Sequence, residues 1–158
     1  MDIRVGNGYD THPLINGSAL ILGGVSIPHN KKIKGHSDGD ALVHAIIDSI
    51  LGAMGVGDIG QFFPSENIKN KNISSLMLLS EIEKLLTDSS YTIINSDSTI
   101  ILEKPILKNY IQDMKNNLSK ILKLSEKCIS IKATTNDGLG FIGQEKGLSV
   151  ISTILIKR

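Results

Sequence analysis

The pattern of hydrophobic and polar residues changes period along the first half of the chain. Residues 3–12 alternate between apolar and polar, which predicts a strand. Two short apolar runs meet at Gly23-Gly24 within residues 19–28, a pattern typical of a β-hairpin. Apolar residues then recur with the period of a helix over about 38–54 and again over about 74–87. Strands are therefore expected to precede two helices.

The second half of the chain returns to strand patterns. Residues 55–72 hold three glycines and a proline and predict a surface loop. The remaining chain predicts a strand, a helix opened by Pro105 and two closing strands, at about 91–102, 105–123, 128–135 and 147–157. This order favours an α+β fold, with helices packed on one face of a mixed β-sheet. A chain of 158 residues fits a single domain, 1–158.

Charge and cysteine content narrow the classes of function. The net charge is +1, with 17 basic and 16 acidic residues interspersed, so we expect neither a nucleic acid nor a membrane as partner. Cys128 is the single cysteine, which excludes an internal disulfide and a thiolate cluster. Neither a signal sequence nor an apolar run of about 18 residues is visible, so a cytoplasmic location is expected.

The stretch "GHSDGDALVHAIID", residues 35–48, places two histidines and three aspartates within an otherwise apolar helical pattern. Burying such groups without partners costs several kcal/mol, so they need one another, a metal or a ligand. Helical spacing puts Asp40, His44 and Asp48 on one face. A solvated face with a hydrogen-bonded histidine is one interpretation, and a functional site is the other.

The motif "YDTH" offers a complement to that helix. Asp10 and His12 lie two residues apart on a predicted strand, so their side chains point to the same side of the sheet. Together with His44 they would form a nitrogen and oxygen site with one open position, which is typical of a catalytic zinc.

Two loops carry further polar groups. "GVGDIG" would hold Asp58 and its neighbouring N–H groups towards a ligand, although a glycine-rich turn is commonly just a turn. The sequence "KATTNDGLG" supplies hydroxyl, amide and carboxylate groups suited to phosphate oxygens and to a hard cation such as Mg²⁺. A polar β-turn is the alternative interpretation of this second loop.

Four motifs in order, "RVGNGYDTHPL", "HSDGDALVHAIIDSILGAMGVGDIGQFFP", "INSDSTIILEKP" and "IKATTNDGLGFIGQEKG", run nearly from end to end of the chain. With them the chain resembles the 2-C-methyl-D-erythritol 2,4-cyclodiphosphate synthase family. The resemblance implies a homotrimer with the sheets around a central axis and active sites between subunits. It also implies conversion of 4-diphosphocytidyl-2-C-methyl-D-erythritol 2-phosphate to the cyclic diphosphate with release of CMP, by attack of the 2-phosphate on the β-phosphorus.

The resemblance also implies roles for individual residues. Asp10, His12 and His44 would hold one Zn²⁺ per subunit, His36 and Thr135 would stabilise the transition state, and a Mg²⁺ or Mn²⁺ bound with the substrate would lie near Asp137. The implied substrate-binding residues are Asp10, His12, His36, Ser37, Asp58, Ile59, Gly60, Phe63, Asn67, Leu102, Pro105, Ile106, Leu107, Lys108, Ala133, Thr134, Thr135, Asn136, Asp137, Phe141 and Gln144.

Two positions differ from the residues that are usual in the family, and two aspartates lie near the predicted ligands in sequence. Gln144 stands where the family usually has an arginine, and Ile106 where it commonly has a lysine, so the anion and base contacts would differ here. Asp40 or Asp48 is expected to orient a histidine ligand. Two other classes of function remain: a zinc-dependent phosphohydrolase, although the "HExxH" helix is absent, and a non-catalytic trimeric module that binds an isoprenoid diphosphate.

Overall fold

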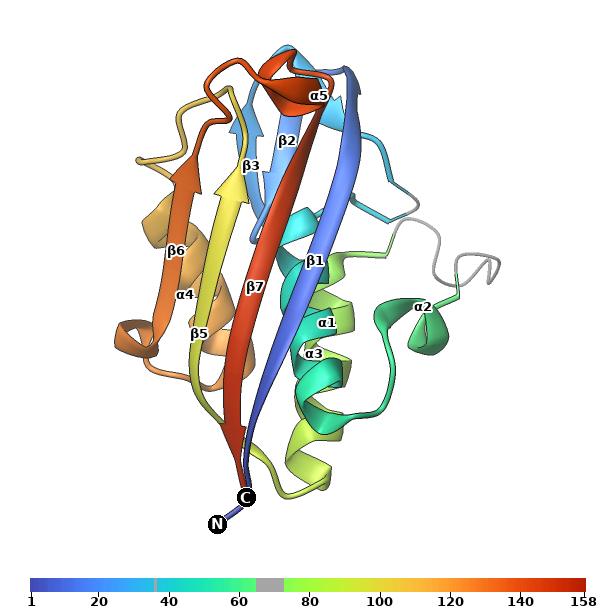
Figure 1. Ribbon diagram of the computed structural model, residues 1–158, viewed down its shortest axis with the longest axis vertical. Coiled ribbons are helices and arrows are strands. Elements are labelled where there is room, and N and C mark those ends of the chain that lie inside the picture. The colour runs from blue at the N-terminus through green and yellow to red at the C-terminus, as the bar shows by residue number, and fades with distance from the viewer. Residues whose placement is uncertain (36, 65–72) are drawn as a thin grey trace.

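The main sheet of the protein is mixed, and the structure is a computed structural model that describes residues 1–35, 37–64 and 73–158. The described residues form a five-stranded sheet in the order β4-β1-β7-β5-β6 (Figure 1). Its strands are β1 (Ile3–Asn16), β4 (Lys31–Ile33), β5 (Thr92–Ile101), β6 (Ile129–Thr134) and β7 (Gly147–Lys157). All neighbours are antiparallel except β5 and β6, which run parallel.

A separate two-stranded hairpin lies beside the sheet, as the apolar runs predicted. It consists of β2 (Ala19–Leu22) and β3 (Val25–Pro28), joined at Gly23 and Gly24. Both glycines have positive φ angles, 57° and 71°. The two-residue turn of a hairpin favours such angles, which residues with a side chain rarely adopt.

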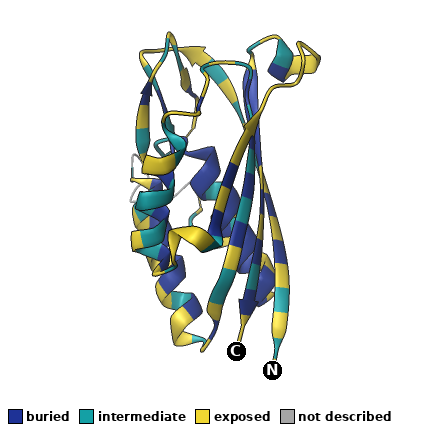
Figure 2. Ribbon diagram, turned by 90° about the vertical axis from the view of Figure 1, so that its left-hand side faces the viewer, coloured by how far each residue is buried: buried dark blue, intermediate teal, exposed yellow. Residues whose placement is uncertain are grey.

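Three long helices cover one face of the sheet, which confirms the expected α+β class. They are α1 (Ala41–Met54), α3 (Ser75–Asp88) and α4 (Ile111–Leu122). The short helical turns are α2 (Ile59–Phe62), the 3₁₀ turn η2 (Glu126–Cys128) and α5 (Gly140–Gly143). Seen edge-on, the helices form one layer and the long strands the other (Figure 2). None of the described helices is long and apolar enough to cross a membrane.

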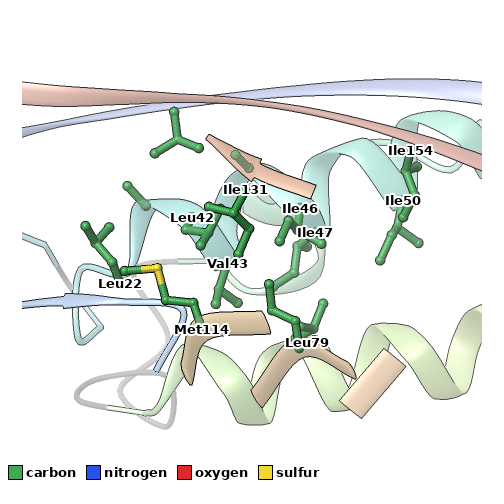
Figure 3. Close-up of a cluster of buried hydrophobic side chains, with 14 of the residues drawn as sticks. Leu22, Leu42, Val43, Ile46, Ile47, Ile50, Leu79, Met114, Ile131 and Ile154 are labelled. Atoms are coloured by element: carbon green, nitrogen blue, oxygen red, sulfur yellow. The ribbon is translucent and has the colours of Figure 1, made fainter. Parts of the chain in front are cut away.

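The hydrophobic core lies between these two layers and is centred on α1. Figure 3 shows Ile46 and Ile47 of α1 among the buried side chains, together with Leu79 of α3 and Met114 of α4. All four are fully buried. Because α1 contacts the sheet on one side and α3 on another, it is apolar nearly all round, and its few polar side chains stand out.

Two glycines of β1 allow α1 to lie directly on the strand. A Cβ atom at Gly6 would lie 1.8 Å from the carbonyl oxygen of Ser49, and one at Gly8 would lie 1.9 Å from that of Ala45. Two residues of a strand rise about 6.8 Å and four residues of a helix about 6.0 Å, so the two glycines keep step with successive turns of α1.

The predicted helix boundaries need two corrections. The helix predicted from Pro105 begins only at Ile111. The buried Leu107 first accepts a hydrogen bond from the Tyr110 N–H, in a turn that precedes the helix. The helix predicted from residue 38 begins after Asp40, which caps it. Within the loop predicted over 55–72, α2 forms a single turn, and residues 65–72 lie outside the described residues.

The face of the sheet opposite the helices carries exposed apolar side chains. Val5 is 66% exposed, Tyr9 54% and Ile151 41%. Tyr9 pairs with Ile151 across β1 and β7, and all three side chains lie on the side of the sheet away from α1. We call Val5, Tyr9 and Ile151 the outer-sheet patch. Val5 is separated from the Tyr9–Ile151 pair by the polar pair Asn7–Thr153. Exposed large apolar side chains gathered on one face of a sheet favour a surface that another molecule covers.

Replacing Gly8 with alanine should destabilise the fold severely. The new methyl group meets the backbone of α1, which cannot rotate away as a side chain can, so we expect Gly8→Ala to lower the free energy of unfolding by at least about 2–3 kcal/mol. Urea denaturation measures this. In the matched control Gly52→Ala, the new Cβ has no neighbour nearer than the Asn7 oxygen at 3.7 Å, and the helix should gain about 0.5–1 kcal/mol. Equal effects of the two substitutions would contradict the close-packing argument.

Candidate active site

The three predicted metal ligands come together between β1 and α1. Asp10 and His12 project from the helix-facing side of β1, and His44 projects from α1. His12 Nε2 lies 2.8 Å from Asp10 Oδ2, and His44 Nδ1 lies 3.3 Å from the same oxygen. One ligand atom from each residue lies within 4.8 Å of the other two. The two side chains on the inner face of β1 and the one from α1 thus converge on one point.

The chemistry of this cluster fits a divalent cation. Asp10 Oδ2 and His12 Nε2 are buried and face each other at 2.8 Å; while His12 is neutral with its proton on Nδ1, no described residue donates a hydrogen bond to either atom. An unsatisfied buried polar atom costs roughly 1–3 kcal/mol, which a cation shared by the three residues would offset. Two imidazole nitrogens and a carboxylate oxygen are ligands that zinc and similar metals accept.

Each imidazole ring is held by a backbone or hydroxyl oxygen at the nitrogen that faces away from Asp10. His12 Nδ1 lies 2.9 Å from the carbonyl oxygen of Lys34, which can only accept, so Nδ1 carries the proton and Nε2 is left bare. His44 is held through the other nitrogen, because its Nε2 lies 2.9 Å from Ser75 Oγ while Nδ1 faces Asp10. Sequence reasoning missed Ser75, which is the first residue of α3.

The charges within the cluster depend on one another. Burial tends to raise the pKa of Asp10, but its contacts with His12 and His44 outweigh burial and lower that pKa. The contact with Asp10 in turn raises the pKa of His12, against the effect of burial. A cation and a proton therefore compete for His12, as expected wherever a metal ligand must be deprotonated.

Asp40 and Asp48 bind backbone groups and not the described ligands His12 or His44, so the expectation that they orient a histidine is wrong for these two. Asp40 is fully buried and accepts hydrogen bonds from the N–H groups of Gly23 at 2.9 Å, Gly24 at 2.7 Å and Val43 at 3.1 Å. It therefore ties the hairpin turn to the start of α1. Asp48 accepts from the Ile59 N–H at 2.7 Å and holds the chain that follows α1. Burial raises the pKa of each carboxyl, that of Asp40 to about 6.

The segment around α2 presents several predicted substrate-binding residues. Asp58 caps α2 by accepting from the Gln61 N–H at 3.0 Å, and it is exposed, as is Gly60. Ile59 and Phe63 are half-buried against the core. Of the remaining predicted site residues, His36 and Asn67 lie outside the described residues.

A cavity of about 340 Å³ lies where β5 and β6 end. Because these strands are parallel, their final residues meet at one edge, where the Leu102 N–H donates to the Thr134 carbonyl at 2.9 Å. The cavity is lined by the predicted residues Leu102, Pro105, Ile106, Leu107, Lys108, Ala133, Thr134 and Thr135, and also by Glu103 and Ile111. Eight residues predicted from two separate motifs thus line one cavity.

Glu103, which lies within the predicted pocket range 102–108, organises the polar loop beside the cavity, a role that the sequence did not predict. Its Oε1 accepts from the Asn136 N–H at 2.7 Å and from the Gly138 N–H at 3.3 Å. Asp137 between them has a positive φ of 51°, and its carboxylate lies 3.4 Å from Thr135 Oγ1 on the exposed surface. Two further predicted residues are exposed nearby: Phe141 lies in α5 and Gln144 directly after it.

The cluster of Asp10, His12 and His44 lies at the same height in the sheet as the cavity, but on a different strand. Strand register places Asp10 beside Val150, Val150 beside Ile100 and Ile100 beside Ala133. Three strand spacings of about 4.8 Å put the two regions roughly 14 Å apart. Val150 and Ile100 lie between them and are fully buried, so core side chains fill the helix-facing route between the two regions within one chain.

Fold and site together define an α+β protein with a candidate metal centre and a small-molecule pocket. The chain belongs to the YgbB family, whose model matches residues 3–157. The resemblance drawn from the four motifs is thereby confirmed.

Named relatives agree with that assignment. The chain is 53% identical to the 2-C-methyl-D-erythritol 2,4-cyclodiphosphate synthase of Clostridium kluyveri, over 98% of this chain and 94% of the relative. Among solved structures, the bifunctional IspDF from Campylobacter jejuni has a TM-score of 0.94 and 40% identity, covering 99% of this chain but 42% of that one. IspF from Plasmodium falciparum, described as a CDP complex, has a TM-score of 0.85 and 37% identity, over 98% and 95% of the two chains.

The burial of Asp40 should make stability depend on pH. Between its ordinary pKa of 3.8 and the raised value of about 6, the folded protein binds a proton that the unfolded chain does not. The stability that proton binding by Asp40 contributes to the folded state is therefore greatest below pH 4 and is lost as the pH rises through about 6. In metal-free protein, we expect the free energy of unfolding of wild type to fall by about 2 kcal/mol relative to that of Asp40→Asn between pH 4.5 and 7.5. Urea unfolding across this range measures the difference, and a difference that does not change with pH would contradict the argument.

Proposed function

We propose that this chain converts 4-diphosphocytidyl-2-C-methyl-D-erythritol 2-phosphate to 2-C-methyl-D-erythritol 2,4-cyclodiphosphate and CMP. The observation that carries the proposal is the convergence of Asp10, His12 and His44 on one point, in a chain of the YgbB family. In this reaction an oxygen of the 2-phosphate bonds to the β-phosphorus, and the bond from that phosphorus to the oxygen shared with CMP breaks. The substrate supplies both the nucleophile and the leaving group.

The protein then has to fold the substrate on itself and neutralise its charge, the two contributions that dominate phosphoryl transfer. Asp10, His12 and His44 would hold a Zn²⁺, which as a Lewis acid withdraws charge from phosphoryl oxygens. On the proposed plan His36 and Ser37 contact the phosphates, and Asp58 and Gly60 hold the methylerythritol hydroxyls. Asp58 and Gly60 are exposed and available for this contact.

The cavity at the ends of β5 and β6 is proposed to bind the cytidine. Its volume of about 340 Å³ is of the size that small-molecule sites have. Ile106 is 83% exposed at the rim, so an apolar side chain lies where the family commonly has a lysine, and base recognition would rest on backbone groups. The structure of the Plasmodium falciparum relative is described as a CDP complex, which agrees with a cytidine nucleotide as ligand.

Phosphate contacts at this end are proposed for the loop after β6. Thr135 lines the cavity and Asp137 lies beside it, so the Thr135 hydroxyl would reach the phosphates and the Asp137 carboxylate a Mg²⁺ or Mn²⁺ bound with them. Gln144 is exposed after α5 and offers a neutral amide where the family usually has an arginine. We therefore propose that the anion contact at this position is weaker here.

We further propose that three copies assemble with their sheets around a central axis and with active sites between subunits. The outer-sheet patch supports this, because Val5, Tyr9 and Ile151 are apolar and exposed on the face without helices. The separation of the two half-sites supports it too, since Val150 and Ile100 block the route between them in one chain. The cytoplasmic location stays a prediction, which the free thiol of Cys128 fits.

The function is tested by incubating the purified protein with Zn²⁺, Mg²⁺ and the diphosphocytidyl substrate, and analysing products by mass spectrometry. We expect CMP and the cyclic diphosphate in equal amounts, and about one Zn²⁺ per chain by elemental analysis. His44→Ala should remain folded but lose both metal and activity, because it removes one ligand of the cluster. His29→Asn, which changes a histidine outside the cluster, is the control and should keep both.

Other products would overturn the proposal in favour of the alternatives. Linear hydrolysis products would indicate a phosphohydrolase. Unchanged substrate, together with bound isoprenoid diphosphate, would indicate a non-catalytic binding module. Full Zn²⁺ occupancy in folded His44→Ala would remove His44 from the proposed ligands.

The interfacial site predicts that two inactive variants restore each other. His44→Ala removes the metal half and Thr135→Ala the nucleotide half, and each should be nearly inactive alone. After co-refolding at equal ratio, about a quarter of the sites in a closed ring would take one intact half from each variant. We expect activity of that order on mixing. Mixed trimers seen by native mass spectrometry that remain as inactive as their parents would contradict sites shared between subunits.

A further inference from the structure

A short chain of hydrogen bonds lies behind His44, on the side away from Asp10. His44 Nε2 lies 2.9 Å from Ser75 Oγ, and Ser75 Oγ donates in turn to Asp38 Oδ1. Asp38 also accepts from the Ser75 N–H at 2.9 Å and from the Asp40 N–H at 3.2 Å. Ser75 is fully buried, so no water competes for its hydroxyl. These hydrogen bonds link the segment before α1, the first residue of α3 and the candidate metal centre.

The chemistry of these groups fixes the direction of each hydrogen bond. An aspartate carboxylate can only accept, so the Ser75 hydroxyl proton points to Asp38. With its proton committed, Ser75 Oγ can only accept from His44, which requires the imidazole proton to lie on Nε2. The lone pair then lies on Nδ1, the atom 3.3 Å from Asp10 Oδ2.

A second serine near the same nitrogen is less well placed to do this. Ser37 Oγ lies 3.2 Å from His44 Nε2 and 3.5 Å from Ser75 Oγ, and it is only half-buried. It accepts a long hydrogen bond of 3.4 Å from the Gly39 N–H. Ser75 is nearer, more buried and locked by Asp38, so it takes the imidazole proton and leaves the Ser37 hydroxyl free to turn towards a substrate.

We propose that Asp38 and Ser75 are positioning residues that hold His44 in the tautomer and orientation needed to bind a cation. The inference rests on the proposed metal centre and deepens it. Carboxylates that fix a metal-bound histidine from behind commonly change metal affinity by 10–100-fold. Here the carboxylate acts through a serine, and the serine lies 31 residues from the histidine in sequence.

The first test measures Zn²⁺ affinity by competition with a chromophoric chelator. Ser75→Ala removes the acceptor for the His44 proton without adding bulk, and it should weaken Zn²⁺ binding by 10–100-fold. Asp38→Asn keeps one acceptor oxygen and should weaken binding less. Ser74→Ala is the matched control, because Ser74 is exposed, precedes α3 directly and makes no side-chain cap hydrogen bond. Unchanged affinity in Ser75→Ala, or an equal loss in Ser74→Ala, would overturn the proposal.

The second test examines the tautomer of His44 directly, in protein without metal. Long-range ¹H–¹⁵N NMR of metal-free wild type, at a pH where the ring is neutral, reports which nitrogen of His44 carries the proton. We expect the Nε2–H form in wild type and a mixture of tautomers in Ser75→Ala. An Nδ1–H form in wild type would overturn the proposal. If wild type binds no Zn²⁺ but shows the Nε2–H form, the metal centre fails and the positioning of His44 stands.

Discussion

The approach of α1 to β1 is the constraint on which the rest of the molecule depends. Gly6 and Gly8 present bare backbone to the helix, and any side chain there would collide with carbonyl oxygens of α1. Since strand and helix advance nearly in step, this contact also fixes which turn of α1 lies beside each residue of β1. Two residues beyond Gly8, the strand carries Asp10, and the facing turn of α1 carries His44. The metal cluster is thus a continuation of the packing contact.

Polar side chains around this contact fix the position of α1 through hydrogen bonds at its start and in its middle. Asp40 ties the start of α1 to the hairpin turn through three backbone N–H groups, and Asp48 ties its middle to the segment of α2. Asp38 and Ser75 join the same region to α3. A buried carboxylate is stable only where such donors converge, so each of these acids also restricts where its neighbours can lie. Among the described residues of this stretch, His44 belongs to the candidate metal centre, and the carboxylates fix α1 and the segments around it.

Local periodicity explains which parts could be predicted from the sequence. Asp10 and His12 share a face because strand side chains alternate, and His44 stands out from an apolar helix. Ser75 and Glu103 gave no such signal, because their partners lie 37 and 33 residues away and only the folded chain brings them together. Tertiary contacts also gave Asp40 part of its role, since two of the three N–H groups it accepts from, those of Gly23 and Gly24, belong to the hairpin.

The division of the site follows from the order of strands in the sheet. With β7 and β5 between β1 and β6, the side chains that fill the core also separate Asp10, His12 and His44 from the cavity at the ends of β5 and β6. On the helix-covered face of one chain, the buried side chains of Val150 and Ile100 therefore keep the two regions apart. The opposite face has no helices and presents apolar side chains, which favours association with further copies. If the cavity binds the nucleotide as proposed, the same packing leaves assembly with further copies as the way in which nucleotide and metal residues can meet.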